Sequence, residues 1–416
     1  MTLVPTALVD DLAPETPSVG FVVARYGADV LGGAETYCRL LAENLAAAGH
    51  DITVLTTCAS DGFTWANERA AGESLEGGVR VRRFPVGCRN NDKWLGLHSA
   101  IDSGESVPYA QQIQWMAESV WSPELLDEAA KDDRYDWLVA IPYMFGTTFW
   151  TAVAFPDRTA VIPCFHDEPH ARLPAVLDAL TSARGLMMNT ATERSLLADA
   201  VGEVFPERTS SVLASPVVSV GYDPLPPPSE DDVTAFCARH GVEPGYLLYA
   251  GRREEGKGVG RLFDLYRTYA DTVPCPRPLA LVGRGPLAIP DDLRAKVIDF
   301  GFLPDADMAP AYAAAGVFVH PSRMESLGMV LLEAWNAGTP ALVDARSPVL
   351  VEHCLNSGGG LWWERPAEFI EAIEMLTEDD DLAASIAARG REYVQDAFRW
   401  SAVQTRFFNA LETWAP

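Results

Sequence analysis

The sequence is poor in basic residues. It contains 32 lysines and arginines against 58 aspartates and glutamates, so its formal net charge is −26 at pH 7. A surface of this sign repels nucleic acid and anionic lipid, whose recognition depends on clustered cations. We therefore expect neither of these to be a partner.

Cysteines are also few, and no two of them form a CxxC pair among the seven in the chain. A disulfide scaffold is excluded by this spacing, and a reducing, cytoplasmic location is expected. The first 18 residues contain no lysine or arginine and are interrupted by prolines. They therefore lack the charged and apolar regions of a signal peptide, and we expect residues 1–18 to form a disordered leader.

Long hydrophobic runs are nearly absent. The longest uncharged stretch covers residues 137–156, but Pro142 and Gly146 interrupt it. This pattern predicts a short strand followed by the start of a helix, and no integral membrane segment.

What the sequence does contain is an alternation of short apolar runs and longer helical patterns. With 416 residues and 48% hydrophobic composition, two or three globular domains are expected. In the first half we expect strands at 20–25, 52–57, 79–84, 137–141, 160–164, 185–189 and 211–214, and helices at 34–48, 109–130 and 192–200. In the second half strands are expected at 246–250, 279–282, 297–300, 317–320 and 341–343. This alternation predicts an α/β fold with two doubly wound parallel sheets.

The proline-rich segment 221–232, GYDPLPPPSEDD, separates the two halves. We expect a first domain at 19–220, a linker at 221–243 and a second domain at 244–398, with a helix at 399–416 that packs back on the first domain. Ligands of doubly wound sheets bind beyond the carboxyl ends of the strands, so we expect a cleft between the domains, lined by the loops that follow the strands.

One such loop follows the strand LLYAG, which ends at Gly251. Arg252 and Lys257 bring two cations to this glycine-rich strand-to-helix turn. Close backbone approach and positive charge together suit a diphosphate. A solvated charged turn is the alternative.

A second loop follows the strand VFVH and contains Glu325, Ser326, Leu327 and Gly328. We expect Ser326 to be the N-cap of the next helix, so that the amides of residues 327–329 could receive an anion. Glu333 lies one and a half turns into that helix, where a carboxylate could accept two vicinal hydroxyls such as those of a ribose, or could simply sit on a polar stripe. Glu325 could accept hydroxyls of a sugar.

Three further patterns are less specific. His166 and His170 flank Pro169 in the run CFHDEPH, and no other His or Cys cluster supplies more ligands, so we expect no metal site. The GxG at Gly283 lacks the third glycine of a dinucleotide fingerprint. A basic cluster could touch a phosphorylated acceptor, although we interpret it as a solvated strand edge; its members are Arg80, Arg82, Arg83, Arg89 and Lys93.

The motifs GRREEGKG, GRGP, DFGFLPDADM and HPSRMESLGMVLLEAWNAGTP, together with GGAETYCRLLAENLAAAGHDITVLT near the N-terminus, resemble the retaining GT-B glycosyltransferases of family 4, also called glycosyltransferase group 1. The resemblance covers residues 19–405. It includes the ExxxxxxxE spacing from Glu325 to Glu333 and the basic pair Arg252 and Lys257.

The resemblance implies a nucleotide-sugar donor, a hydroxyl-bearing acceptor and a role in glycan or glycoconjugate biosynthesis. Arg252 and Lys257 would neutralise the diphosphate in place of a metal, so no cofactor is expected. Glu333 would bind the ribose and Glu325 the transferred sugar. The remaining residues that the resemblance places at the donor are Gly32, Gly33, Gly251, Gly283, Phe302, Leu303, Ser326, Leu327 and Gly328, with Phe302 and Leu303 beside the base.

His166 is similar to the active-site histidine of that family's first domain, which contacts the donor sugar. A loop histidine without a role is the alternative reading of His166.

The resemblance thus implies a metal-independent, retaining glycosyltransferase, and we expect a UDP-sugar in preference to a GDP-sugar because UDP-sugars are the commoner donors in that family. Two rivals are a non-catalytic nucleotide-sugar-binding protein and a Rossmann-type oxidoreductase. The second rival lacks its full glycine fingerprint.

Overall fold

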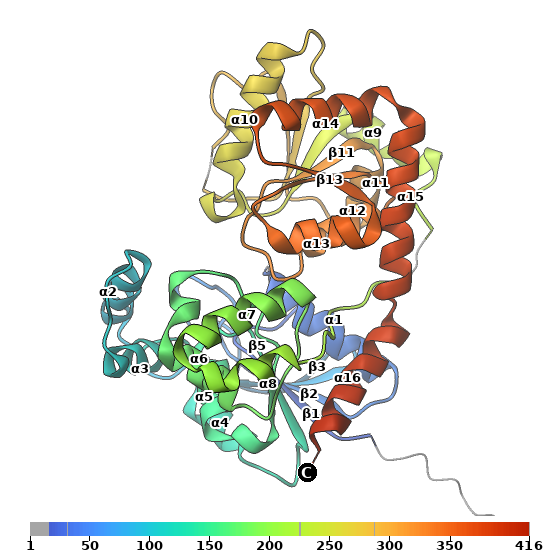
Figure 1. The fold of residues 1–416 in the computed structure, drawn as a ribbon. Helices are drawn as coiled ribbons and strands as arrows, with labels where there is room; N and C mark the ends of the chain where they lie inside the picture. The colour runs from blue at the N-terminus through green and yellow to red at the C-terminus, as the bar shows by residue number, and fades with distance from the viewer. Residues whose placement is uncertain (1–15, 31, 224–225, 287, 416) are drawn as a thin grey trace, which may run out of the picture.

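The structure is a computed structural model that describes residues 16–30, 32–223, 226–286 and 288–415. In this part of the chain two α/β units are stacked one above the other, the first below and the second above (Figure 1). The predicted α/β class and the two doubly wound sheets are confirmed. The predicted leader lies mostly outside the described residues.

The first sheet has seven strands in the order β3-β4-β2-β1-β5-β6-β7, and only β3 is antiparallel to its neighbour. The strands are β1 (Val19–Val23), β2 (Ile52–Thr57), β3 (Gly72–Glu76), β4 (Val79–Phe84), β5 (Trp137–Ile141), β6 (Thr159–Val161) and β7 (Gly185–Leu186). Side chains alternate across β1: Phe21 packs in one cluster with Leu41, whereas Val22 packs on the opposite face with Leu125. Both faces are therefore covered, which explains the continuous apolar runs of the central strands.

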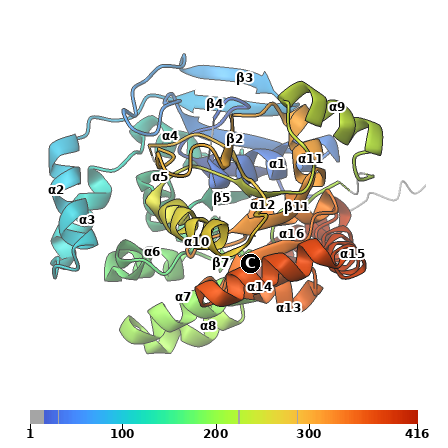
Figure 2. The same cartoon turned by 90° about the horizontal axis from the view of Figure 1, so that it is seen from above.

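The helices of this unit surround the sheet in both views (Figures 1 and 2). They are α1 (Gly33–Ala47), α2 (Asn91–Asp102), α3 (Tyr109–Ala117), α4 (Pro123–Ala129), α5 (Gly146–Ala154), α6 (Pro174–Ser182), α7 (Ala191–Val204) and α8 (Thr209–Leu213), with 3-10 turns at Pro156–Arg158, Pro169–Arg172 and Pro206–Arg208. The single helix predicted at 109–130 is wrong, because Ser122 caps a new helix that begins at Pro123. The strand predicted at 211–214 is also wrong: this short apolar run belongs to α8, and periodicity cannot assign so short a segment.

The basic cluster is not a solvated strand edge. β4 is covered by β3, and the side chain of Arg83 is only 5% exposed and forms an ion pair with Glu76. Arg82 pairs with the buried Glu128. The cations are therefore largely neutralised by acids of the same domain.

The second sheet has six parallel strands in the order β10-β9-β8-β11-β12-β13. They are β8 (Tyr246–Ala250), β9 (Leu279–Val282), β10 (Val297–Gly301), β11 (Ala315–His320), β12 (Ala341–Asp344) and β13 (Gly360–Trp363). Its helices are α9 (Glu230–His240), α10 (Val259–Thr272), α11 (Asp305–Ala313), α12 (Met329–Asn336), α13 (Pro348–Ser357), α14 (Pro366–Glu378) and α15 (Asp380–Ala397), with a 3-10 turn at Glu255–Lys257.

The chain crosses between the units twice. The segment predicted as a linker contains α9, whose Phe236 is fully buried, so part of this segment belongs to a core. α15 and then α16 (Trp400–Trp414) run down one side of the molecule from the second unit to the first (Figure 1). Phe407 of α16 stacks on Phe21 of β1 at a centroid distance of 5.9 Å. The last helix therefore completes the hydrophobic core of the first unit.

Among the described helices none is both long enough and apolar enough to cross a membrane. The uncharged run at 137–156 forms β5 and α5 instead.

Candidate functional site

A cavity of about 470 Å³ lies between the two units. Its walls include the loops that follow β6, β8, β11 and β12, at the carboxyl ends of both sheets. The lining residues include His166, Asp167, Glu255, Gly256, Gly258, Arg323, Met324, Glu325 and Arg346. This is where a doubly wound fold binds its ligands.

The loop after β8 turns tightly because of its glycines. Gly258 has a φ of +73°, and a Cβ atom there would overlap the carbonyl oxygen of Pro321 in the loop after β11. This close approach holds Lys257 against the second loop. Arg252 is 63% exposed and pairs with Glu254 at 3.1 Å. The two cations of the predicted diphosphate site thus belong to one turn, at the start of α10.

The most informative contact of the site joins the two loops. Lys257 Nζ lies 2.8 Å from Glu325 Oε1, and His320 Nε2 lies 3.7 Å from the same oxygen. Burial raises the pKa of Glu325, but Lys257 and His320 outweigh it and hold the pKa at about 2. Burial lowers the pKa of His320 to about 4. The site therefore presents an ionised carboxylate and a lysine, side by side and largely shielded from water.

The helix after β11 begins two residues later than predicted. Gly328, with a φ of +77°, is the N-cap of α12, so the prediction of Ser326 as N-cap is wrong. A glycine can reverse the chain there without steric cost, and the backbone turn replaces a side-chain cap. Ser326 instead accepts a hydrogen bond from the hydroxyl of Thr190 on its carbonyl oxygen at 3.4 Å. Leu327 is buried, and its carbonyl accepts from His353 at 2.9 Å.

Glu333 lies on α12 and is partly buried. It accepts a hydrogen bond from the Tyr312 hydroxyl at 3.1 Å. Burial raises the pKa of Glu333 to about 7, although the Tyr312 hydroxyl acts in the opposite direction. A carboxylate of this kind is only partly ionised near neutrality, and a donor of further hydrogen bonds would favour its ionised form.

The other residues of the second unit that were predicted to contact the donor lie in loops that follow its strands, and they differ in how exposed they are. Gly251 and Gly283 directly follow β8 and β9. A Cβ on Gly283 would overlap the Gly251 carbonyl oxygen, so backbone packing accounts for this glycine. Phe302 is 48% exposed, with the Arg284 guanidinium 5.8 Å from its ring. Leu303 is buried in the core, which leaves Phe302 as the accessible apolar surface of this pair.

His166 lies across the cavity, on the loop after β6. Its Nδ1 is 3.9 Å from Glu168 Oε1, and burial lowers the pKa of the imidazole below its ordinary value. The preceding Cys164 has a φ of +50°, a strained conformation for this residue. Glu193 of α7 supports the turn by accepting the amide of Phe165 at 2.6 Å. The loop is thus held in one conformation that brings His166 to the cavity.

Gly32 and Gly33 begin α1 in the same unit. A Cβ on Gly32 would overlap the carboxylate of Glu35, whereas Gly33 has open space around it. Neither glycine is among the described residues that line the interdomain cavity.

Several site residues were missed by the sequence reasoning. Arg323 and Arg346 add two cations to the cavity wall, and both follow strands of the second sheet. Their position directly after predicted strands could have identified both arginines as candidate site residues. The role of Glu193 could not be predicted, because a glutamate near the start of a helix is usually explained by helix capping.

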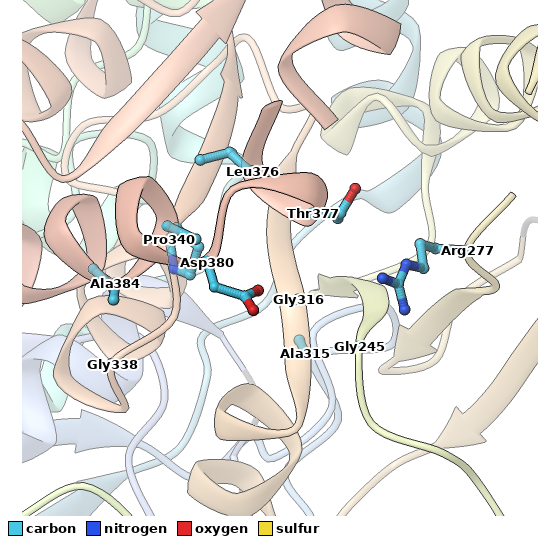
Figure 3. A pocket seen from close by; sticks show the side chains of 12 residues that line it. Gly245, Arg277, Ala315, Gly316, Gly338, Pro340, Leu376, Thr377, Asp380 and Ala384 are labelled. Carbon is cyan, nitrogen blue, oxygen red and sulfur yellow. The ribbon is translucent and has the colours of Figure 1, made fainter. Parts of the chain in front are cut away.

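A second cavity of about 260 Å³ lies on the opposite edge of the second sheet (Figure 3). Gly245 and Ala315 line it at the amino ends of β8 and β11, with Arg277, Thr377 and Asp380 around it. It faces away from the loops that carry the charged residues. It is therefore separate from the interdomain site.

The comparisons with known proteins agree with this geometry. Residues 32–208 match the family described as glycosyl transferase 4-like domain, and residues 238–393 match the family described as glycosyl transferases group 1. The chain belongs to the group 1 glycosyltransferases. Their enzymes transfer a glycosyl group, and this glycosyltransferase carries both characteristic domains.

Curated relatives extend over nearly the whole enzyme. The D-inositol 3-phosphate glycosyltransferase of Jonesia denitrificans is 25% identical and aligns over 94% of this chain and 93% of its own. The phosphatidyl-myo-inositol mannosyltransferase of Mycolicibacterium smegmatis is 29% identical, with the same two coverages. The glycogen synthase of Mycobacterium tuberculosis is 26% identical, with 90% of each chain aligned.

Solved structures share the fold of this glycosyltransferase. Anabaena Alr3699/HepE in complex with UDP superposes with a TM-score of 0.68 at 17% identity, covering 95% of this chain and all of that one. The sucrose-phosphate synthase of Thermosynechococcus elongatus superposes with a TM-score of 0.70 at 18% identity, covering 96% and 100%. The architecture is therefore the GT-B fold.

Proposed function

We propose that this glycosyltransferase moves a sugar from a nucleotide-sugar donor, with UDP favoured over GDP as the leaving group, to an acceptor hydroxyl. The transfer retains the anomeric configuration and needs no metal at the diphosphate. The observation that carries the proposal is the ion pair between Lys257 and Glu325, of which Glu325 lines the interdomain cavity. One supplies positive charge for a diphosphate, and the other accepts hydroxyls of the sugar attached to it.

The remaining roles in the proposal are those that the family resemblance implies. Arg252 adds a second cation at the diphosphate, and Glu333 accepts the ribose hydroxyls. Phe302 offers its exposed ring to the base. His166 contacts the transferred sugar from the first unit. A nucleotide-sugar donor is supported by HepE, which shares the fold and is known in complexes with UDP and with UDP and glucose.

The chemistry then needs no protein nucleophile. The acceptor hydroxyl attacks the anomeric carbon from the face that the departing diphosphate leaves, and a diphosphate oxygen takes the proton. Lys257 and Arg252 stabilise the negative charge that develops on that leaving group, while the protein positions both substrates. The cytoplasmic location expected from the cysteine content stays a prediction.

The test is a calorimetric titration of the enzyme with UDP and with uridine, in EDTA and then in excess magnesium. We expect the affinity for UDP to be the same in both buffers, because the counter-charge comes from the protein. Lys257→Ala should weaken the binding of UDP much more than the binding of uridine. The matched control is Lys296→Ala, since Lys296 is an exposed lysine that pairs with Asp271. UDP affinity that vanishes in EDTA and returns with magnesium would show that the diphosphate site requires a metal.

A further inference from the structure

Three side chains of the first unit converge outside the donor site. His98 and Asp102 lie one turn apart on α2, and His170 lies in the 3-10 turn Pro169–Arg172 after β6. His98 Nε2 is 3.4 Å from Asp102 Oδ2, and His170 Nδ1 is 3.0 Å from Asp102 Oδ1. Each of the three side chains offers one possible ligand atom, and these three atoms lie within 4.8 Å of one another. His170 is thus brought from a distant part of the sequence to two residues that are neighbours on α2.

These separations match those of a small metal ion's ligands. Zinc–nitrogen and zinc–oxygen bonds of about 2.0–2.1 Å in a tetrahedral site place neighbouring ligand atoms roughly 3.3 Å apart. The separations of 3.4 Å from His98 and 3.0 Å from His170 are close to that value, the first to Oδ2 and the second to Oδ1 of Asp102. One ligand atom from each of the three side chains lies within 4.8 Å of the other two. Two imidazoles and one carboxylate are also a ligand set that zinc accepts.

The surroundings orient the two histidines. The Nε2 atom of His170 lies 3.4 Å from Glu168, whose carboxylate also receives the Tyr143 hydroxyl. A carboxylate on the far nitrogen of a histidine is the usual outer support of a metal ligand, because it fixes the ring and leaves the other nitrogen free to bind. The His98 ring packs against the rings of both Trp94 and Trp115, at centroid distances of 4.6 and 6.0 Å.

An ion can also reach this site. The side chain of Asp102 is 49% exposed, and that of His98 is 24% exposed. An ion bound by these three side chains would therefore have a fourth coordination position open to solvent, which a water molecule would fill.

We propose that His98, Asp102 and His170 bind one zinc ion, through Nε2 of His98, a carboxylate oxygen of Asp102 and Nδ1 of His170. The ion would join α2 to the turn that follows the His166 loop. This site is separate from the diphosphate site, so the proposal does not depend on the donor or on the metal requirement of transfer. The sequence reasoning excluded a metal because it considered only the ligands around Pro169, whereas the structure adds two from α2.

The test uses the full-length enzyme, stripped of metal by a chelator and then titrated with zinc against a chromophoric competitor. We expect one equivalent of tightly bound zinc per chain. His98→Gln and Asp102→Asn should each weaken this binding by at least about 100-fold. The matched control is His240→Gln, because His240 pairs with Asp307 at 3.3 Å without belonging to such a cluster in the described residues.

Melting temperatures of the metal-free variants establish that they fold. If His98→Gln fails to fold, the half-exposed Asp102→Asn still decides the question. Zinc binding that is absent, or equal in the wild type and in Asp102→Asn, would overturn the proposal. Equal binding would place the ion elsewhere, for example on the exposed thiols of Cys88 or Cys275. UDP titration of the same metal-free enzyme reports separately on the diphosphate site.

Discussion

At the scale of single residues, Glu333 gives the clearest prediction of pH dependence. Its pKa is about 7 because it is buried, and it must be ionised to accept both ribose hydroxyls. We expect the affinity for UDP to rise between about pH 6 and about pH 8, as measured by calorimetry. Glu333→Gln should lose about 1–3 kcal/mol of binding and the pH dependence.

A 2′,3′-dideoxy analogue of UDP is the control for this prediction, because it lacks the hydroxyls that Glu333 would accept. Equal losses for both ligands would point to a structural role. The stability of the free enzyme supplies a second check. Because the folded-state pKa exceeds the ordinary value of 4.5, the contribution of Glu333 to the free energy of unfolding is full below about pH 4.5 and is lost as the pH rises through about 7.

His166 should matter for turnover and not for nucleotide binding. It belongs to the first unit, whereas the cationic turn and α12 belong to the second. His166→Ala should therefore lower kcat and leave the Kd of UDP nearly unchanged. The measurement compares transfer kinetics with calorimetry after the melting temperature of the variant has been matched to the wild type. Wild-type turnover in the folded variant would remove His166 from the site.

The sequence indicated the charged residues of the site but not their contacts. Arg252, Lys257 and Glu325 could be selected because each follows a predicted strand. The ion pair between Lys257 and Glu325 could not be predicted from the sequence, because it depends on how closely Gly258 approaches Pro321. The cap of α12 was assigned to Ser326 because serine is a frequent N-cap, and the left-handed backbone of Gly328 overrode that preference.

At the scale of elements, α7 holds the loop that carries His166. Glu193 accepts the amides of Phe165 and Asn189 at 2.6 and 2.5 Å from a buried position. Glu193→Ala would leave both amides buried without this partner, so we expect a loss of roughly 2–4 kcal/mol in the free energy of unfolding. Urea denaturation measures it.

The control for α7 is Glu203→Ala on the same helix. Glu203 is 68% exposed and pairs only at the surface with Arg172, so its loss should change stability by no more than about 0.5 kcal/mol. Similar effects of the two substitutions would show that the Glu193 contacts do not stabilise the loop.

Elements of the second sheet were easier to predict than the rest. β8 and β9 were predicted at their observed bounds, because buried parallel strands are short apolar runs between loops. β3 was missed because its residues are mostly exposed. β13 was missed although it is paired with β12, since its four residues, GLWW, are too few to show a period.

At the scale of the whole molecule, α16 makes the stability of the first unit depend on the last part of the chain. Phe407 is fully buried against Phe21. Phe407→Ala should lower the free energy of unfolding by about 3–5 kcal/mol, as measured by denaturation, while UDP still raises the melting temperature because its proposed ligands lie in the other unit. Thr405→Ala, on the exposed side of α16, is the control. A variant that no longer responds to UDP would contradict this separation.

The two crossings of the chain have a mechanical consequence. Tyr222 on the outward crossing is bridged to Arg399 on the return crossing, and its amide donates to the Phe398 carbonyl at 2.6 Å. Because the two crossing segments are bonded to each other at this point, we expect the units to rotate about the junction more readily than to slide past each other. The Tyr222 hydroxyl also reaches the first carbonyl of α12, at Met329, at 3.3 Å. The junction is thus bonded directly to the helix that carries Glu333, so we expect a rotation of the units to shift the proposed ribose site.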